Sequence, residues 1–106
     1  MGRCIVRLEA PEGHPVYLEW STVVDAPVTY AMTREELEEH VREEYGNQGL
    51  EELPARLERA DRCGASWRDA YRESAEDTIR GNRAGPNETE LTVEQIIERY
   101  WTRRPE

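Results

Sequence analysis

One stretch of low charge constrains what this chain can fold into. Residues 20–33 read Trp-Ser-Thr-Val-Val-Asp-Ala-Pro-Val-Thr-Tyr-Ala-Met-Thr and carry one charge, at Asp25, although 35% of the whole chain is charged. Val, Thr, Tyr and Trp are the side chains that suit a pleated, half-buried strand. We therefore expect this stretch to belong to a sheet, with the residues before it pairing onto it and the residues after it packing against the result.

Two alternating segments precede this stretch and lead into it. Over residues 3–9 and again over residues 16–20, side chains alternate with a period of two, which is typical of half-buried strands. Residues 10–15 between them contain two prolines and a glycine and predict a turn. We expect an antiparallel hairpin whose second strand extends as far as Val24, followed by a short third strand at residues 28–30.

Helix-start signals follow. The sequence Thr-Arg-Glu-Glu at residues 33–36 is a capping box, in which the threonine hydroxyl and the last glutamate each accept a backbone N–H. It predicts a helix over residues 34–45 that stops at Gly46. Leucines at helical spacing predict a second helix over residues 54–63, which begins at its proline and ends at Gly64.

The last third of the chain has shorter signals. Residues 66–69 and 74–77 both have the pattern of a short helix start, and residues 81–87 have the composition of a loop. A second capping box at residues 92–95 opens a last helix with a wide apolar face. Together these patterns predict an α+β fold in a single domain over residues 1–106: an N-terminal antiparallel β-hairpin of two to three strands packed against three to four α-helices.

Charge restricts the classes of partner. The net charge is −9, which argues against direct nucleic-acid binding and against binding to anionic membranes, and is compatible with a basic protein partner. The sequence contains neither a run of 18 apolar residues nor a secretion signal, so we expect a cytoplasmic protein. All 14 basic residues are arginines and phenylalanine is absent, which points to a high-GC genome.

Catalytic and metal signatures are absent from the sequence. No P-loop, Rossmann, HExxH or GxSxG pattern occurs, so we expect no cofactor and favour a protein that is not an enzyme. Cys4, Cys63, His14 and His40 lack the close spacing of zinc ligands, so no metal site is expected. Whether the two cysteines pair is left open by the sequence.

Two groups of residues have the chemistry of a protein-interaction surface. Glu35, Glu39 and Glu43 form an acidic stripe with a spacing near that of nucleic-acid phosphates, and the simpler explanation of this stripe is a solvated outer helix face. The second group contains Trp, Tyr and Arg, the types enriched at binding hot spots, and its alternative role is to close one end of the core. Its members are Trp67, Arg68, Tyr71 and Arg72.

A third group has the chemistry of an anion site. Arg80, Asn82 and Arg83 lie in a loop whose glycines allow backbone N–H groups to approach a ligand, and arginine pairs with phosphate or carboxylate. The alternative is a surface loop with solvated arginines. Asp25 and His14 are the acid–base candidates for such a site, whereas His40, four residues after Glu36, is expected to pair with it on the helix surface. A further role for Asp25 is to cap a turn.

Three segments carry a resemblance. Residues 20–29, residues 32–36 (Met-Thr-Arg-Glu-Glu) and residues 82–86 (Asn-Arg-Ala-Gly-Pro) are similar to a group of uncharacterised small acidic proteins of actinobacteria and their phages. The resemblance covers most of the chain and implies a source in those organisms. It implies no activity.

Two functions from different classes follow from the sequence. The first is a non-enzymatic protein-binding or modulator module, of phage type, acting on a host protein through the interaction residues above. The alternative is a binder of a nucleotide or phosphorylated metabolite, or a minor enzyme, that holds its anion at the Arg83 loop. The narrow apolar stripe of the first helix leaves room for a homodimer seam.

Overall fold

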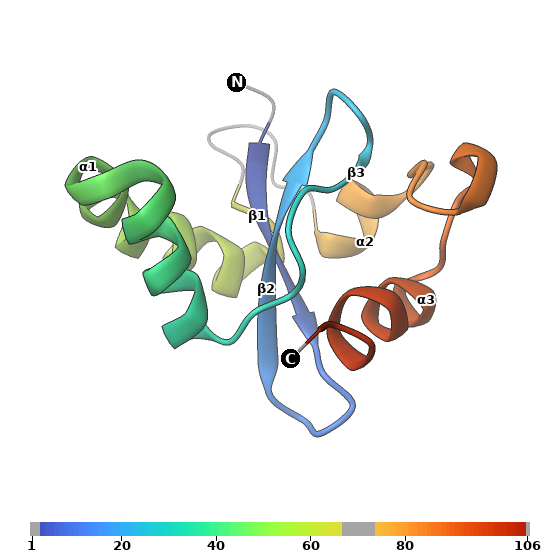
Figure 1. Cartoon of the computed structure of the whole chain (residues 1–106), viewed down its shortest axis with the longest axis horizontal. Helices are drawn as coiled ribbons and strands as arrows, with labels where there is room; N and C mark the ends of the chain where they lie inside the picture. Colours follow the sequence, from blue (N-terminus) through green and yellow to red (C-terminus); the bar gives the residue numbers. More distant parts are fainter. Residues whose placement is uncertain (1–2, 67–73, 106) are drawn as a thin grey trace.

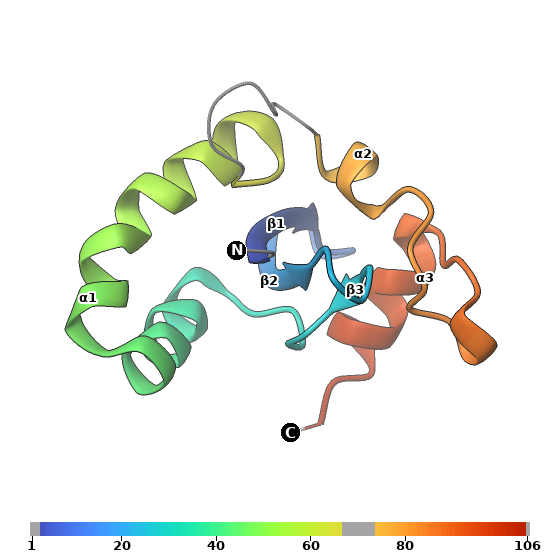
Figure 2. The same ribbon diagram turned by 90° about the horizontal axis from the view of Figure 1, so that it is seen from above.

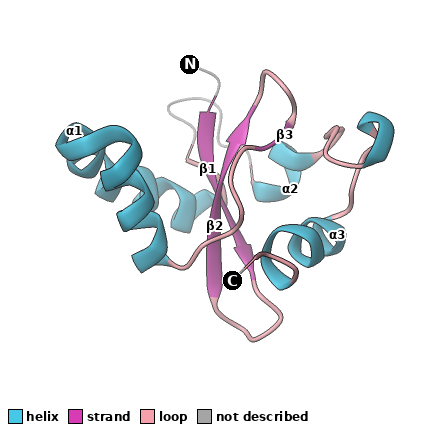
Figure 3. Cartoon of the chain, viewed as in Figure 1, coloured by secondary structure: helices cyan, strands magenta, loops and turns pink. Residues whose placement is uncertain are grey.

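The structure, a computed structural model, describes residues 3–66 and 74–105. Its described part contains a three-stranded antiparallel sheet and three α-helices, which confirms the expected α+β class (Figure 3). The elements in chain order are β1 (Arg3–Glu9), β2 (Pro15–Ser21), β3 (Ala26–Pro27), α1 (Arg34–Cys63), α2 (Ala75–Ile79), a 3-10 turn (Pro86–Glu88), α3 (Val93–Ile97) and a π-helical turn (Glu98–Thr102) that continues α3.

The predicted hairpin is the centre of the fold. Strands β1 and β2 pair along their whole length, from Arg3 opposite Ser21 to Glu9 opposite Pro15. Strand β2 ends at Ser21, so its expected extension to Val24 is wrong. Residues 22–25 turn instead, with Asp25 at a φ of 54°.

The third strand lies earlier than the sequence suggested. Strand β3 pairs with the end of β2, and residues 28–30, where we expected the strand, form no ladder. The reason is local, because the Thr29 hydroxyl rather than a backbone carbonyl accepts the Glu19 N–H, at 3.0 Å. Backbone pairing to β2 resumes at Met32, which exchanges both hydrogen bonds with Tyr17.

Helices cover both faces of the hairpin. In Figures 1 and 2, α1 lies on one side of β1 and β2, and α2 and α3 lie on the other. The α2–α3 side buries alternate strand residues against Ile79 and Ile96, and the α1 side buries the other strand set against a helical stripe. The first set is Cys4, Val6, Leu8, Val16, Leu18 and Trp20; the second is Ile5 and Tyr17, packed on Leu37, Val41, Leu53, Leu57 and Ala60.

The range of α1 contains two helical segments that meet at a kink at Gly46, where the sequence predicted that the first helix stops. Its capping box is present, with Thr33 as the N-cap, and its end at Gly64 is in the left-handed conformation, both as predicted. Gly46 is non-helical, with a φ of 67°, which confirms the predicted stop, and a second helical segment begins directly after it. The expectation that the second helix begins at Pro54 is therefore wrong, since Pro54 lies inside the resumed helix and simply donates no bond there.

The two later helix starts are confirmed. Ser74 caps α2 by accepting the Asp77 N–H, and Thr92 and Gln95 form the second capping box at the start of α3. The start expected at residues 66–69 falls largely outside the described residues. Leu91 and Ile96, on either side of the second capping box, are both buried in the core on the α2–α3 side, as a hydrophobic staple requires.

Substitution of the buried Gly49 tests how tightly α1 packs next to its kink at Gly46. A Cβ atom at this buried position would lie 2.5 Å from the Tyr45 Cβ and 3.0 Å from a Val41 methyl carbon. We expect Gly49→Ala to lower the free energy of unfolding by about 1–3 kcal/mol, as overpacking of a core does. Urea denaturation measures this, with the exposed neighbour Gln48→Ala as the control, expected within about 0.5 kcal/mol of wild type. Equal stabilities of the two variants would contradict the tight corner.

Candidate functional site

The outward side of α1 carries the densest charge in the molecule. Between residues 35 and 52 there are eight glutamates and one arginine. All eight glutamates are exposed. Glu36 pairs with Arg104, and we call the other seven the acidic face: Glu35, Glu38, Glu39, Glu43, Glu44, Glu51 and Glu52. The predicted stripe of Glu35, Glu39 and Glu43 is part of it.

Few of these carboxylates are neutralised within the protein. Among the described residues, Glu39 is the one member of the acidic face in an ion pair, with Arg42. The later part of α1 differs, because there Glu58 pairs with Arg62 at 3.6 Å and Asp61 pairs with Arg34. The acidic face is thus a local excess of charge and not a general property of the helix.

The second predicted interaction group cannot be placed. Trp67, Arg68, Tyr71 and Arg72 all lie outside the described residues, and their role stays a prediction.

The third predicted group is divided by the fold. Asn82 is buried, and its amide donates to the carbonyls of Ile79 and Leu91 and accepts the N–H groups of Ala84 and Leu91, so it clips the loop together. Arg80 pairs with Asp77 at 3.1 Å. An anion at this loop would therefore rely on Arg80 and Arg83.

Arg83 itself lies between acidic groups. Its guanidinium is 3.8 Å from the carboxylates of both Asp25 and Glu88, and its backbone N–H donates to the Asp25 carbonyl. An incoming anion would compete with these two carboxylates. His14, the other acid–base candidate, stacks edge-on against Trp101, with ring centroids 5.4 Å apart.

Sequence reasoning missed a buried carboxylate between β2 and α1. The Glu19 side chain is only 2% exposed. The sequence could not reveal this, because strand alternation does not show whether the face that carries Glu19 is solvated or covered. Tyr45 donates its hydroxyl to Glu19 at 3.0 Å, His40 Nε2 lies 3.0 Å from the carboxylate, and Arg56 lies at 3.9 Å. These three partners all come from α1, so they tie the helix to the sheet.

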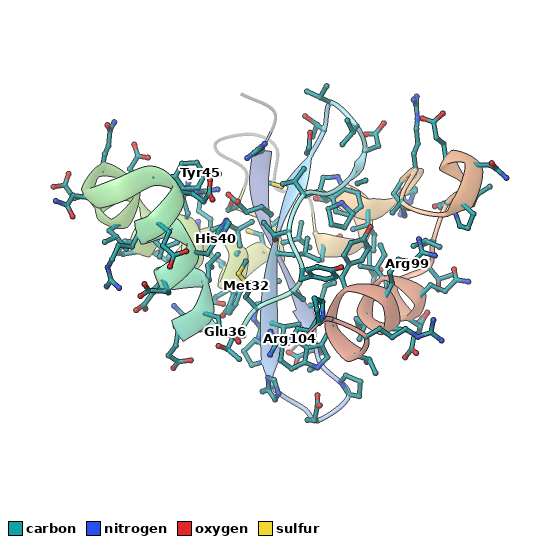
Figure 4. The ribbon with its side chains drawn as sticks, in the orientation of Figure 1. Met32, Glu36, His40, Tyr45, Arg99 and Arg104 are labelled. Carbon is teal, nitrogen blue, oxygen red and sulfur yellow. The ribbon has the colours of Figure 1, made fainter. Side chains whose placement is uncertain are left out.

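The same contacts correct the prediction for His40. We expected His40 to pair with Glu36 on the helix surface, but its ring nitrogen lies 3.0 Å from the Glu19 carboxylate. Figure 4 shows His40 between α1 and the sheet. Burial, opposed by an arginine bond and reinforced by the Glu19 charge, raises the pKa of the Tyr45 hydroxyl. Its proton therefore stays on the oxygen and remains available to the Glu19 carboxylate at neutral pH.

A second polar cluster fixes the other end of the interface between α1 and the sheet. Tyr17 donates its hydroxyl to Asp61 at 2.7 Å, and Arg34 donates both to that hydroxyl and to Asp61. Burial and the Asp61 carboxylate raise the pKa of Tyr17. Tyr17 and Glu19 are buried on the sheet and bond to side chains of α1, so both clusters fix the orientation of α1 on the sheet.

A groove lies between the start of α1 and the segment after α3. Its volume is about 550 Å³, and its lining includes Tyr30, Met32, Glu36, Trp101 and Arg104. Figure 4 shows Met32, Glu36 and Arg104 close together near the middle of the molecule. Arg104 crosses the groove and donates to Glu36 at 2.7 Å.

Two arrangements are absent from the described part of the chain, a cluster of metal ligands and a helix able to span a membrane. Within residues 3–66 and 74–105, no three His, Cys, Asp or Glu side chains are arranged to hold a metal ion. Cys4 is buried in the sheet and Cys63 is half-buried at the end of α1, and no disulfide joins them. Of the helices described, none has the length and apolarity needed to cross a bilayer.

Comparisons with known proteins give no match: no protein-family model, no curated protein and no solved structure is similar to this chain.

The Glu19 network is tested by removing one hydroxyl. Tyr45→Phe leaves the buried carboxylate with one donor fewer, so we expect the free energy of unfolding to fall by about 1–3 kcal/mol at neutral pH. Tyr30→Phe is the control, because the structure gives the half-exposed Tyr30 hydroxyl no hydrogen bond among the described residues. Urea denaturation of both proteins measures the difference. If Tyr45→Phe is no less stable than Tyr30→Phe, the network does not hold α1.

The contact across the groove is tested by titration. The Arg104 guanidinium, helped by the Thr33 N–H, holds the pKa of Glu36 below its ordinary value of 4.5. The contribution of the Glu36–Arg104 ion pair to folding stability is therefore complete above about pH 4.5 and is lost as the pH falls through the lowered pKa of Glu36. We expect Arg104→Ala to raise the pKa of Glu36, as followed by carbon NMR of the carboxyl.

The stability difference between wild type and Arg104→Ala should accordingly shrink as the pH falls below about 4.5. Arg103→Ala is the matched control, because Arg103 pairs with Glu98 at 2.9 Å and should leave the pKa of Glu36 unchanged. An unchanged Glu36 titration in Arg104→Ala would contradict the contact.

Proposed function

We propose that this protein is a non-enzymatic protein-binding module whose acidic face docks on a basic surface of another protein. One observation carries the proposal. Six of the seven glutamates of the acidic face have no ion-pair partner among the described residues. Elsewhere in the described chain, arginines pair with nearby carboxylates, as Arg62 does with Glu58 and Arg80 with Asp77. Unpaired charge concentrated on one helix is the feature that an oppositely charged partner recognises and that accelerates encounter.

The fold presents this charge at fixed positions. Leu37 and Val41 are fully buried against the sheet, and the capping box fixes the start of the helix. Glutamates four residues apart therefore stand roughly 6 Å from one another on a rigid surface. Repulsion between glutamates at this spacing costs a few tenths of a kcal/mol per pair. The attraction between these glutamates and a basic partner would offset that cost.

Solubility is the competing explanation of the acidic face. It requires only net charge, so reversing glutamates anywhere on the surface should have the same effect. Docking requires the charges of α1 in particular. The two explanations therefore differ in whether the position of the glutamates matters.

The same proposal includes the kind of protein that the acidic face binds. The resemblance to small acidic proteins of actinobacteria and their phages suggests a modulator that acts on a host protein. The anion-binding alternative stays a prediction, and the carboxylates of Asp25 and Glu88 beside Arg83 give it no advantage over protein binding.

The experiment is affinity capture from a nuclease-treated actinobacterial lysate, with mass spectrometry of the retained proteins. Three baits are compared: wild type, the triple variant Glu35→Arg, Glu39→Arg, Glu43→Arg, and a matched triple variant Glu76→Arg, Glu88→Arg, Glu94→Arg. Both variants have the same net charge, and thermal melting confirms that each is folded. We expect one dominant protein with wild type and with the matched variant, and about tenfold less of it with the α1 variant.

Two results would overturn the proposal. Equal loss of the captured protein from both variants would show that net charge, not the acidic face, is responsible. Capture of no specific protein by the wild-type bait would remove the basis for a binding module in this source.

A further inference from the structure

The Arg104 side chain lies in a set of contacts that has the composition of a guanidinium-binding site. Its guanidinium carbon is 4.1 Å from the centre of the Trp101 ring. One of its nitrogens donates to the Glu36 carboxylate at 2.7 Å and to the Ala31 carbonyl at 3.0 Å. An aromatic face, a carboxylate and a backbone carbonyl are the groups that proteins use to recognise arginine. We call Trp101, Glu36 and the Ala31 carbonyl the arginine cage.

Each wall of the cage is held in place by contacts that do not involve Arg104. Glu36 accepts the Thr33 N–H at 2.8 Å as part of the capping box. Ala31 is buried, and its N–H donates to the Tyr100 carbonyl at 2.9 Å. The cage would therefore keep these two walls without its present occupant.

The third wall is anchored from the hairpin turn. The Trp101 indole N–H donates to the Glu12 carboxylate at 3.1 Å, and the ring packs edge-on against His14. The side of the indole that faces Arg104 is thus presented to the groove by residues of a different segment.

Arg104 has a weakly anchored backbone and a partly exposed side chain. Its backbone N–H reaches the Trp101 carbonyl at 3.3 Å, near the long limit for a hydrogen bond. Its side chain is 29% exposed, and the groove around it, about 550 Å³, extends to Tyr30 and Met32. The groove is larger than one guanidinium requires, so it has room for residues that flank an incoming arginine.

We propose that the arginine cage is a receptor for an arginine side chain of a partner protein, and that Arg104 occupies it as an internal stand-in. A partner arginine binds by replacing Arg104 over Trp101 and beside Glu36. The net charge of −9 favours the approach of such a partner. The cage shares no residue with the acidic face, although Glu36 adjoins Glu35, so this proposal goes beyond the function proposed above and can fail while that function stands.

The opposing explanation is that Arg104 is only a structural strap between the end of the chain's last helix and α1. A strap gains its stability from the same three contacts. Its removal would weaken the fold and create no binding site.

The test uses short peptides in place of the unknown partner. The peptides are acetyl-Gly-Arg-Gly-amide and its lysine and citrulline counterparts, the last of which keeps the planar group without the charge. Isothermal titration calorimetry measures affinity, and the NMR signals of the Trp101 indole N–H and the Ala31 amide report the place of binding. Wild type, Arg104→Ala and the control Arg103→Ala are compared.

We expect the arginine peptide to bind Arg104→Ala about tenfold more tightly than wild type. In wild type, Arg104 competes with the peptide at an effective concentration in the millimolar range, about tenfold above a dissociation constant of roughly 0.1 mM for the cage. Arg103→Ala should bind like wild type. The lysine and citrulline peptides should bind Arg104→Ala at least about fivefold more weakly than the arginine peptide, because neither provides a charged planar donor.

Two further variants are made in the Arg104→Ala protein. Trp101→Leu removes the aromatic wall and should abolish binding. Glu36→Gln removes the charge but keeps a side chain that completes a capping box, and should weaken binding about tenfold. Binding that survives Trp101→Leu would place the peptide elsewhere and overturn the proposal.

The remaining outcomes are decisive in the same way. Equal affinity of wild type and Arg104→Ala, or no preference for arginine over lysine and citrulline, would overturn the proposal. If Arg104→Ala does not fold, Arg104→Gln, which keeps a polar side chain but removes the guanidinium, carries the same test. Failure of both variants to fold would establish Arg104 as a structural strap.

Discussion

The burial of both faces of one hairpin is the constraint on which the rest of this structure depends. Strands β1 and β2 alternate their side chains, so each strand contributes apolar residues to two opposite surfaces. A two-stranded hairpin is marginal in water, and each face needs its own cover. Helix α1 covers one face, and α2 with α3 covers the other, which places the start of α1 and the end of the last helix on either side of the groove.

Glu19 gives the α1 face of the hairpin a direction. A buried carboxylate is costly unless it is paired and hydrogen-bonded, so α1 has to present Tyr45, His40 and Arg56 toward the sheet. With those side chains and the Leu37 stripe turned inward, the acidic face has to point outward. The pairing of the buried Glu19 of β2 and the outward position of the acidic face are thus two consequences of one orientation of α1.

Local signals could be predicted from the sequence, and long-range pairings could not. Both capping boxes and the Gly64 end of α1 depend on residues a few positions apart, the hairpin joins two adjacent segments, and the structure has all of them. The contacts of Glu19 with His40 and of Glu36 with Arg104 join residues 21 and 68 positions apart. Alternation could not show that both strand faces are buried, and Pro54 was misleading because proline suits a helix start better than a helix interior.

The central functional claim is that a partner covers the acidic face of α1. Carbodiimide-driven labelling of carboxylates, with and without the captured protein, measures this residue by residue. The account predicts that labelling of Glu35, Glu38 and Glu43 falls several-fold in the complex while labelling of Glu76 and Glu94 is unchanged. Unchanged labelling along α1, with protection confined to other carboxylates, would contradict it.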